Sequence, residues 1–185
     1  MLNCFVPGSQ GLDRLDPPPA DIPEQCVWVD LLEPTVAEER AVERLLAIDV
    51  PSREEMREIE TSSRLYEENG SLYMTATVVT KIDTDRPESA AITFILSRNR
   101  LITNRYVDPL PFRRFVAYSE RHPSAATSAP AILAGLLESV IEHRGRAGAR
   151  RRRPRRAVLV GLLGAGAEGH RANPRPARGH GAHRA

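Results

Sequence analysis

The sequence predicts an α/β domain in which a mixed β-sheet is layered with helices, followed by a disordered basic tail. Three observations lead to this fold class. The apolar run from Cys26 to Leu32 shows no polar alternation, which is typical of a strand buried on both faces. The middle of the chain alternates apolar runs with turn signals, and apolar residues recur at helical spacing on either side of it. A strand buried on both faces needs a layer on each side.

The first part of the chain predicts two strands. Leu2–Val6 reads as a short strand, and the Pro-rich loop from Asp16 to Pro23 separates it from Cys26–Leu32. Pro34 ends the second strand.

Two short helices follow. Thr35-Val-Ala-Glu38 has the pattern of a capping box, and apolar residues recur behind it at three- and four-residue spacing, so we expect a helix of about three turns. Ser52-Arg-Glu-Glu55 is a second capping box and predicts another helix after Pro51.

The middle of the chain predicts a meander of about four strands. Asn69-Gly70 supplies the two positive φ angles of a tight turn, so Ser63–Glu68 and Ser71–Thr80 should form a hairpin. Turns are also expected at Asp83–Pro87 and Ser97–Arg100. The remaining strands are Ala90–Leu96 and Leu101–Tyr106.

Two amphipathic helices are expected next. Pro109–Glu120 carries Phe112, Phe115 and Val116 on one face, and Pro130–Ile141 carries a similar apolar stripe. The second pattern has no stop signal before the composition changes.

The charge changes sign within this last helical pattern. Residues 1–142 hold 14 Lys/Arg and 23 Asp/Glu, whereas residues 143–185 hold 12 and 1. The second segment also holds eight of the twelve Gly and no aromatic residue, which is the composition of a chain that cannot bury a core. We therefore predict an α/β domain over 1–142, including the start of a long helix, and an Arg/Gly-rich tail over 143–185.

The two cysteines and the hydropathy of the sequence exclude several further classes of site and segment. Cys4 and Cys26 have no His or Cys neighbours in the sequence, so we expect two buried thiols in a reducing compartment and neither a zinc site nor a disulfide framework. Met1–Gln10 lacks the features of a signal peptide, and the run Ala157–Ala167 is well short of the about 20 residues of a membrane span. We expect no membrane-spanning helix.

At this point four stretches carry a resemblance to a known family. They are Val27–Thr35, Pro51–Ile59, Ser63–Met74 and Ile92–Tyr106. Together they resemble the cytosolic domain of the CorA family of magnesium and cobalt transporters, and the likeness extends from residue 1 to about residue 142. The family's Gly-Met-Asn signature at the end of its first membrane helix is absent from this sequence.

The resemblance implies a regulatory domain on the cytoplasmic side of the inner membrane, in a pentameric transporter of divalent cations. It implies no enzyme activity. Because the pore helices are not in this sequence, we expect the chain to be cytoplasmic and not transport-competent on its own. Its partners would be other copies of itself or full-length transporter subunits, for which it could also act as a stand-alone adaptor.

The family's long stalk helix gives way here to Arg150–Arg156 and a Gly/Arg/His tail. One hypothesis is a shift of reading frame. With allowed codons, a frame displaced by one base over His143–Leu162 can encode IADVLERVGADLDELSSSVF, whose apolar positions continue the preceding helix. The nucleotide sequence would test this directly.

Glu54 and Glu55 are the candidate metal residues. The resemblance places them, by order along the chain, where the family binds a regulatory divalent cation such as Mg²⁺, a hard ion that prefers carboxylate oxygens. The alternative is that Glu55 caps its own helix as the partner of Ser52. In the family the site is completed by an acidic residue of a neighbouring subunit's stalk.

The other polar clusters in the sequence do not predict a metal or catalytic site. Asp83, Asp85 and Glu88 lack the glycine and terminal Glu of a calcium loop, so we interpret them as a solvated hairpin tip. No Ser or Cys lies at a motif spacing from a His, so no catalytic centre is predicted. The acidic residues and histidines considered and set aside are Asp30, Glu33, Glu38, Glu39, His122, His170, His180 and His183.

The basic tail leaves one alternative function open. Its run of four consecutive Arg could contact nucleic-acid phosphates without sequence preference. The tail has no aromatic residue for base stacking, which argues against it.

Overall fold

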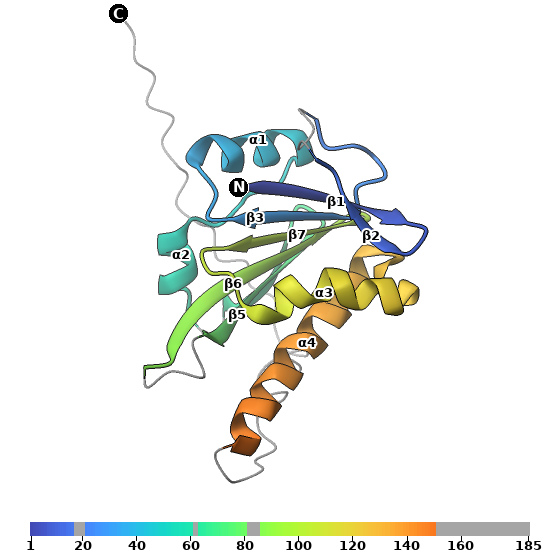
Figure 1. Ribbon diagram of the computed structural model, residues 1–185. Helices are drawn as coiled ribbons and strands as arrows, with labels where there is room; N and C mark the ends of the chain where they lie inside the picture. The colour runs from blue at the N-terminus through green and yellow to red at the C-terminus, as the bar shows by residue number, and fades with distance from the viewer. Residues whose placement is uncertain (17–20, 61–62, 81–85, 151–185) are drawn as a thin grey trace, which may run out of the picture. The chain divides into compact units, whose positions relative to one another are not determined.

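The computed structural model describes residues 1–16, 21–60, 63–80 and 86–150, with side chains described as far as Glu142. In this part of the chain a seven-stranded sheet has the order β2-β1-β3-β7-β6-β5-β4 (Figure 1). The strands are β1 (Leu2–Gly8), β2 (Gly11–Arg14), β3 (Trp28–Leu32), β4 (Leu65–Glu68), β5 (Ser71–Thr80), β6 (Glu88–Ser97) and β7 (Arg100–Arg105). The helices are α1 (Val36–Leu46), α2 (Arg53–Glu58), α3 (Leu110–Arg121), the 3-10 turn η2 (Pro123–Ala126) and α4 (Ala129–Arg150).

The sheet is mixed, as predicted. β3 pairs with β7 in parallel, and the other neighbouring strands pair antiparallel. This parallel pair joins the N-terminal strands to the meander, because Trp28 lies opposite Leu101 and Leu32 opposite Arg105. The predicted layering of helices on a mixed sheet is confirmed.

Local signals in the sequence placed most element ends correctly. The hydroxyl oxygens of Thr35 and Ser52 each accept a hydrogen bond from the backbone N–H of the residue three positions later. The side chains of those residues, Glu38 and Glu55, in turn accept from the backbone N–H of Thr35 and Ser52, so both predicted capping boxes are present. Asn69 and Gly70 have φ of 50° and 73°, as the tight turn between β4 and β5 requires.

Some of the structure differs from the prediction. Strand β2 was not predicted; it folds back antiparallel on β1, with Gly11 at φ 126°. Helix α4 continues to Arg150, beyond the change of composition at Glu142. The turn residues Asp83 and Asp85, and the tail from 151 to 185, lie outside the described residues.

One face of the sheet packs against α3 through aromatic rings. Trp28 stacks on Phe5 with ring centroids 4.4 Å apart and meets the edge of Phe115 at 6.0 Å. Phe112 lies between Trp28 and Phe94, at 6.4 Å and 6.1 Å. This aromatic cluster fixes α3, which Figure 1 shows crossing the sheet.

The opposite face holds an aliphatic core beneath α1, because successive residues of a strand point to opposite faces. Val42 of α1 is buried against Val29 and Leu31 of β3 and against Ile95 and Ile102 of the meander. Cys4 and Cys26 belong to the same cluster. Both faces of β3 are therefore covered, as its mostly apolar sequence predicts.

The Thr35 cap makes the stability of the domain depend on pH. Although burial opposes the shift, hydrogen bonds from Thr35 and from the α-ammonium of Met1 lower the pKa of Glu38 below its ordinary value of 4.5. A carboxyl group whose pKa is lower in the folded state stabilises above pH 4.5, and this contribution is lost as the pH falls toward the folded pKa.

We therefore expect Glu38→Gln to lower the unfolding midpoint in denaturant at neutral pH, and the difference from the unchanged chain to shrink steadily below pH 4.5. Glu24→Gln, at an exposed position, is the matched control. A difference that stays constant from neutral to acidic pH would contradict the assignment.

Candidate functional site

Helix α2 presents the two predicted metal residues differently. Glu55 is half-buried, and its Oε2 accepts from the Ser52 N–H and the Ser52 hydroxyl, each at 2.8 Å. Glu54 is exposed on the outer side of the helix. The capping role considered for Glu55 is thus confirmed, and Glu54 is the carboxylate that faces solvent.

Tyr106, directly after β7, connects α2 to α1. Its hydroxyl donates to Glu39 Oε1 at 2.6 Å, and the Arg53 guanidinium lies 5.3 Å from the centre of its ring. Burial, the bond to Glu39 and the negative charges of Glu39 and Glu54 all raise the pKa of Tyr106. The negative charges of Glu39 and Glu54 therefore both favour the protonated form of the Tyr106 phenol.

A shallow pocket of about 310 Å³ lies beside this group. Arg53, Arg57 and Tyr106 are among the residues that line it. Glu88, assigned to the hairpin tip from the sequence, also lines this pocket. The remaining lining residues are Met56, Thr80, Ser89, Ala90, Ala91 and Val107.

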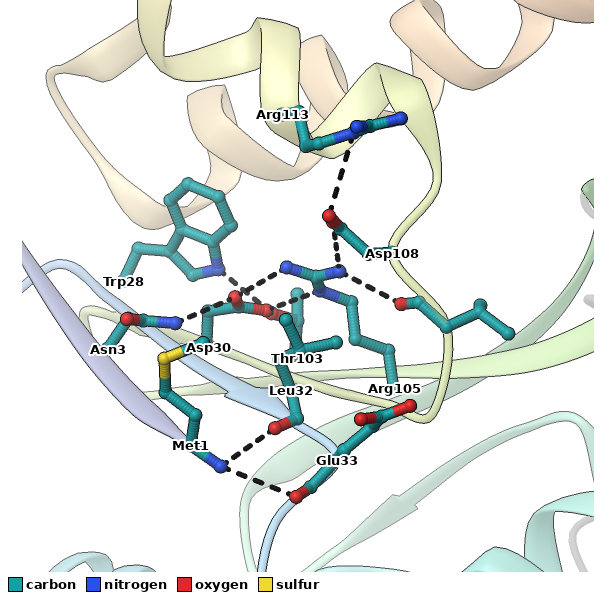
Figure 2. A network of polar contacts seen from close by, with 11 residues as sticks. Met1, Asn3, Trp28, Asp30, Leu32, Glu33, Thr103, Arg105, Asp108 and Arg113 are labelled. Atoms are coloured by element: carbon teal, nitrogen blue, oxygen red, sulfur yellow. Dashed lines mark hydrogen bonds and ion pairs between the residues drawn. The ribbon is translucent and has the colours of Figure 1, made fainter.

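A buried ion-pair network holds the end of β7 that carries Tyr106 (Figure 2). Arg105 donates to both carboxylate oxygens of Asp30, at 2.8 Å each. Thr103 donates to Asp30 Oδ1 at 2.7 Å and accepts from the Trp28 indole N–H at 3.0 Å. Arg105 also reaches Asp108 Oδ1 at 2.8 Å and the carbonyl of Val107 at 2.9 Å.

This network is a structural clamp. It joins the parallel strands β3 and β7 at one end and binds the segment that leads into α3. The Asp30 carboxylate also accepts a hydrogen bond from the Asn3 side-chain amide at 3.4 Å. Both neighbours of β3, strands β1 and β7, therefore contribute donors to it. The Asp30 carboxylate accepts four hydrogen bonds in all and serves to hold the strands of the clamp together.

The structure places the other candidate residues apart from one another. Within the described ranges, no group of three or more His, Cys, Asp or Glu side chains is arranged to hold a metal ion. The His122 ring stacks on Tyr118 with centroids 4.0 Å apart at the end of α3. His170, His180 and His183 lie outside the described residues.

The two cysteines lie in the core of the domain. Both are free and buried, which confirms the prediction of buried thiols. Both belong to the aliphatic core cluster, where the Cys26 thiol donates to the carbonyl of Trp28 at 3.3 Å. The antiparallel pairing of β1 with β3 puts Cys4 opposite Val29, and no short-range signal predicts this pairing.

No helix in the described part of the chain has the length and apolar composition to cross a membrane.

Comparison with solved structures identifies the fold. The described domain resembles the soluble domain of CorA from Methanocaldococcus jannaschii with a TM-score of 0.58 at 14% identity, covering 79% of this chain and 58% of that one. It resembles the full-length CmaX protein with a TM-score of 0.54 at 13% identity, covering 79% and 46%.

Comparison by sequence gives relatives of the same kind. The magnesium transport protein CorA of Mannheimia succiniciproducens is 28% identical over 142 residues, which is 77% of this chain and 45% of that protein. The CorA of Wolinella succinogenes is 31% identical over 93 residues, covering 48% and 28%. The match therefore covers less than half of the length of each of these relatives.

The family model described as CorA-like Mg²⁺ transporter protein matches residues 23–147. This range begins just before β3 and ends within α4, so it contains the parallel strand pair, both capping boxes and the Asp30–Arg105 clamp. Since the match covers more than half of the sequence, the chain belongs to the CorA family.

Proposed function

We propose that this chain supplies the cytoplasmic domain of a CorA-type Mg²⁺ transporter and that the domain responds to Mg²⁺ through Glu54. The proposal rests on the different surroundings of the two neighbouring carboxylates of α2, Glu54 and Glu55. Glu55 is engaged in the Ser52 cap, whereas Glu54 is exposed and acts on the Tyr106 phenol that binds Glu39.

The chemistry of the group suits a hydrated cation. Mg²⁺ keeps several of its waters and is held by one or two carboxylates, so it does not need a complete cage from one chain. Glu54 offers one carboxylate, and the Glu39 carboxylate accepts a hydrogen bond from the Tyr106 phenol, whose pKa the Glu54 charge also raises. Carboxylates of a second copy would complete the coordination, so we propose that Mg²⁺ favours a homo-oligomer of this domain.

The test is a titration of the whole chain with MgCl₂ at constant ionic strength, followed by size-exclusion chromatography with light scattering. We expect Mg²⁺ to increase the mass of the particle. Glu54→Gln should raise the Mg²⁺ concentration at the midpoint by about fivefold or more, because cation affinity follows the number of ligand charges.

Two variants on the same helix serve as controls. Glu58→Gln removes the same charge from an exposed position of α2 and should leave the midpoint unchanged. Glu55→Ala should lower the free energy of unfolding by about 1 kcal/mol, because it removes the acceptor of the capping box. Equal Mg²⁺ responses of Glu54→Gln and Glu58→Gln, or no response of the unchanged chain, would refute the proposal.

A further inference from the structure

Strand β6 extends past the end of its neighbour β7. Its pairing with β5 continues to Glu88, which lies opposite Thr80, whereas its pairing with β7 stops at Ile92, opposite Arg105. Residues 88–91 therefore have a ladder partner in β5 but none in β7. Because alternate residues of a strand direct their backbone N–H and C=O groups to each side, part of this stretch presents backbone donors where β7 has ended.

The pocket of about 310 Å³ beside Tyr106 lies at this overhang, because residues 88–91 of β6 all line it. Helix α2, which lies beside this end of β6 (Figure 1), supplies Arg53, Met56 and Arg57 to the lining. The chain that leaves β7 supplies Tyr106. The walls come from separate parts of the fold, so the pocket is formed before any ligand enters.

Two arginines of α2 make the lining positive. Arg53 and Arg57 are four residues apart, a spacing that puts them on the same side of a helix. Both are exposed, and among the residues that the structure describes neither forms an ion pair with a carboxylate. The Arg53 guanidinium lies 5.3 Å from the centre of the Tyr106 ring. Among the described lining residues Glu88 is the one acid, so the lining carries two positive charges and one negative charge.

These features suit a phosphate group. A guanidinium binds phosphate oxygens through paired hydrogen bonds and keeps its charge at any physiological pH. The exposed Ser89 is a further lining residue, and its hydroxyl can donate to the same anion. A divalent cation is the less suitable occupant, because the charges of Arg53 and Arg57 outweigh that of Glu88.

We propose that this pocket binds a small anion that carries a diphosphate group, with Arg53 and Arg57 as its charged partners. Two guanidinium groups at this spacing can each bind one of the two phosphoryl groups. Inorganic pyrophosphate and a nucleoside diphosphate present the same group. The site is separate from the proposed Mg²⁺ response, because Glu54 does not line the pocket and the binding needs no divalent cation.

The experiment is an NMR titration of the isotope-labelled whole chain, in buffer freed of divalent cations and at constant ionic strength. Sodium pyrophosphate is added in one arm and adenosine diphosphate in the other. The amide signals of Ala90 and Ala91 report on the pocket, whereas those of residues 143–185 report on the Arg-rich tail. We expect the Ala90 and Ala91 signals to shift and saturate in at least one arm. Saturation by the nucleotide at an equal or lower concentration identifies a nucleoside diphosphate, and saturation by pyrophosphate alone identifies the inorganic anion.

Variants of exposed arginines assign the binding to the pocket, with folding checked by circular dichroism. Arg53→Gln and Arg57→Gln should each raise the midpoint at least about tenfold, because each removes a charged donor to the anion. Arg114→Gln removes the same charge from an exposed position of α3 outside the pocket and should leave the midpoint unchanged.

Glu54→Gln separates this site from the Mg²⁺ response and should not weaken the binding of either anion. The proposal fails if neither anion shifts the Ala90 and Ala91 signals, if the shifts are confined to residues 143–185, or if Arg57→Gln and Arg114→Gln have equal effects.

Discussion

Arg105→Met is expected to lower the free energy of unfolding by about 3–5 kcal/mol. Arg105 and Asp30 are 5% and 2% exposed, so the substitution would leave a carboxylate buried without its cation. The bonds to the Val107 carbonyl and to Asp108 would be lost with it, which frees the segment between β7 and α3. Chemical denaturation followed by circular dichroism measures the change.

Two further variants make this result specific to the buried pair. Arg113→Met removes an exposed guanidinium whose Nε lies 3.5 Å from Asp108, and it should cost less than about 1 kcal/mol. Asp30→Asn combined with Arg105→Met should be less destabilised than Arg105→Met alone, because no unpaired charge remains buried. If Arg113→Met cost as much as Arg105→Met, the clamp would not be the cause.

Trp28→Ala is expected to lower the free energy of unfolding by about 3–5 kcal/mol, through the lost apolar contacts and the cavity left behind. The indole is 1% exposed and contacts rings of β1 and α3, so no neighbour can fill the space without moving α3. Trp28 is the single tryptophan of the chain, so the measurement needs circular dichroism and not fluorescence.

The size of this effect is judged against two other substitutions. Trp28→Phe keeps an aromatic ring but removes the N–H that Thr103 accepts, and about 1–2 kcal/mol is expected. Val36→Ala, at a side chain that is 62% exposed, should change stability by less than about 0.5 kcal/mol. A loss for Trp28→Ala no larger than that for Val36→Ala would show that α3 does not depend on this aromatic cluster.

The elements that could be predicted from the sequence are those whose stabilising contacts lie close along the chain. Both capping boxes join residues three apart, and the Asn69-Gly70 turn depends on the φ angles of two adjacent residues. The mostly apolar sequence of β3, in which Asp30 is the one polar residue, also predicted its burial on both faces. These features could be predicted because helix propensity, capping and the apolar pattern of one element depend on residues that are only a few positions apart.

The candidate site was predicted only in part for the same reason. Order along the chain pointed to Glu54 and Glu55, and the capping pattern already assigned a competing role to Glu55. The sequence did not indicate that Glu39 would hold Tyr106, because 67 positions separate them. It was the docking of α1 beside the end of β7 that brought the two together.

Three features depend on the tertiary fold and could not be predicted from local sequence: the parallel pairing of β3 with β7, the Asp30–Arg105 clamp across it, and the packing of Cys4 and Cys26 in one core cluster. Asp30 and Arg105 are 75 positions apart, and neither has a sequence neighbour that marks it as a partner. Such contacts form because strand register and burial bring distant groups into a low-dielectric interior, where a charge must be paired. Family membership could be read from short segments, whereas the chemistry of this chain depends on which of those segments lie next to each other.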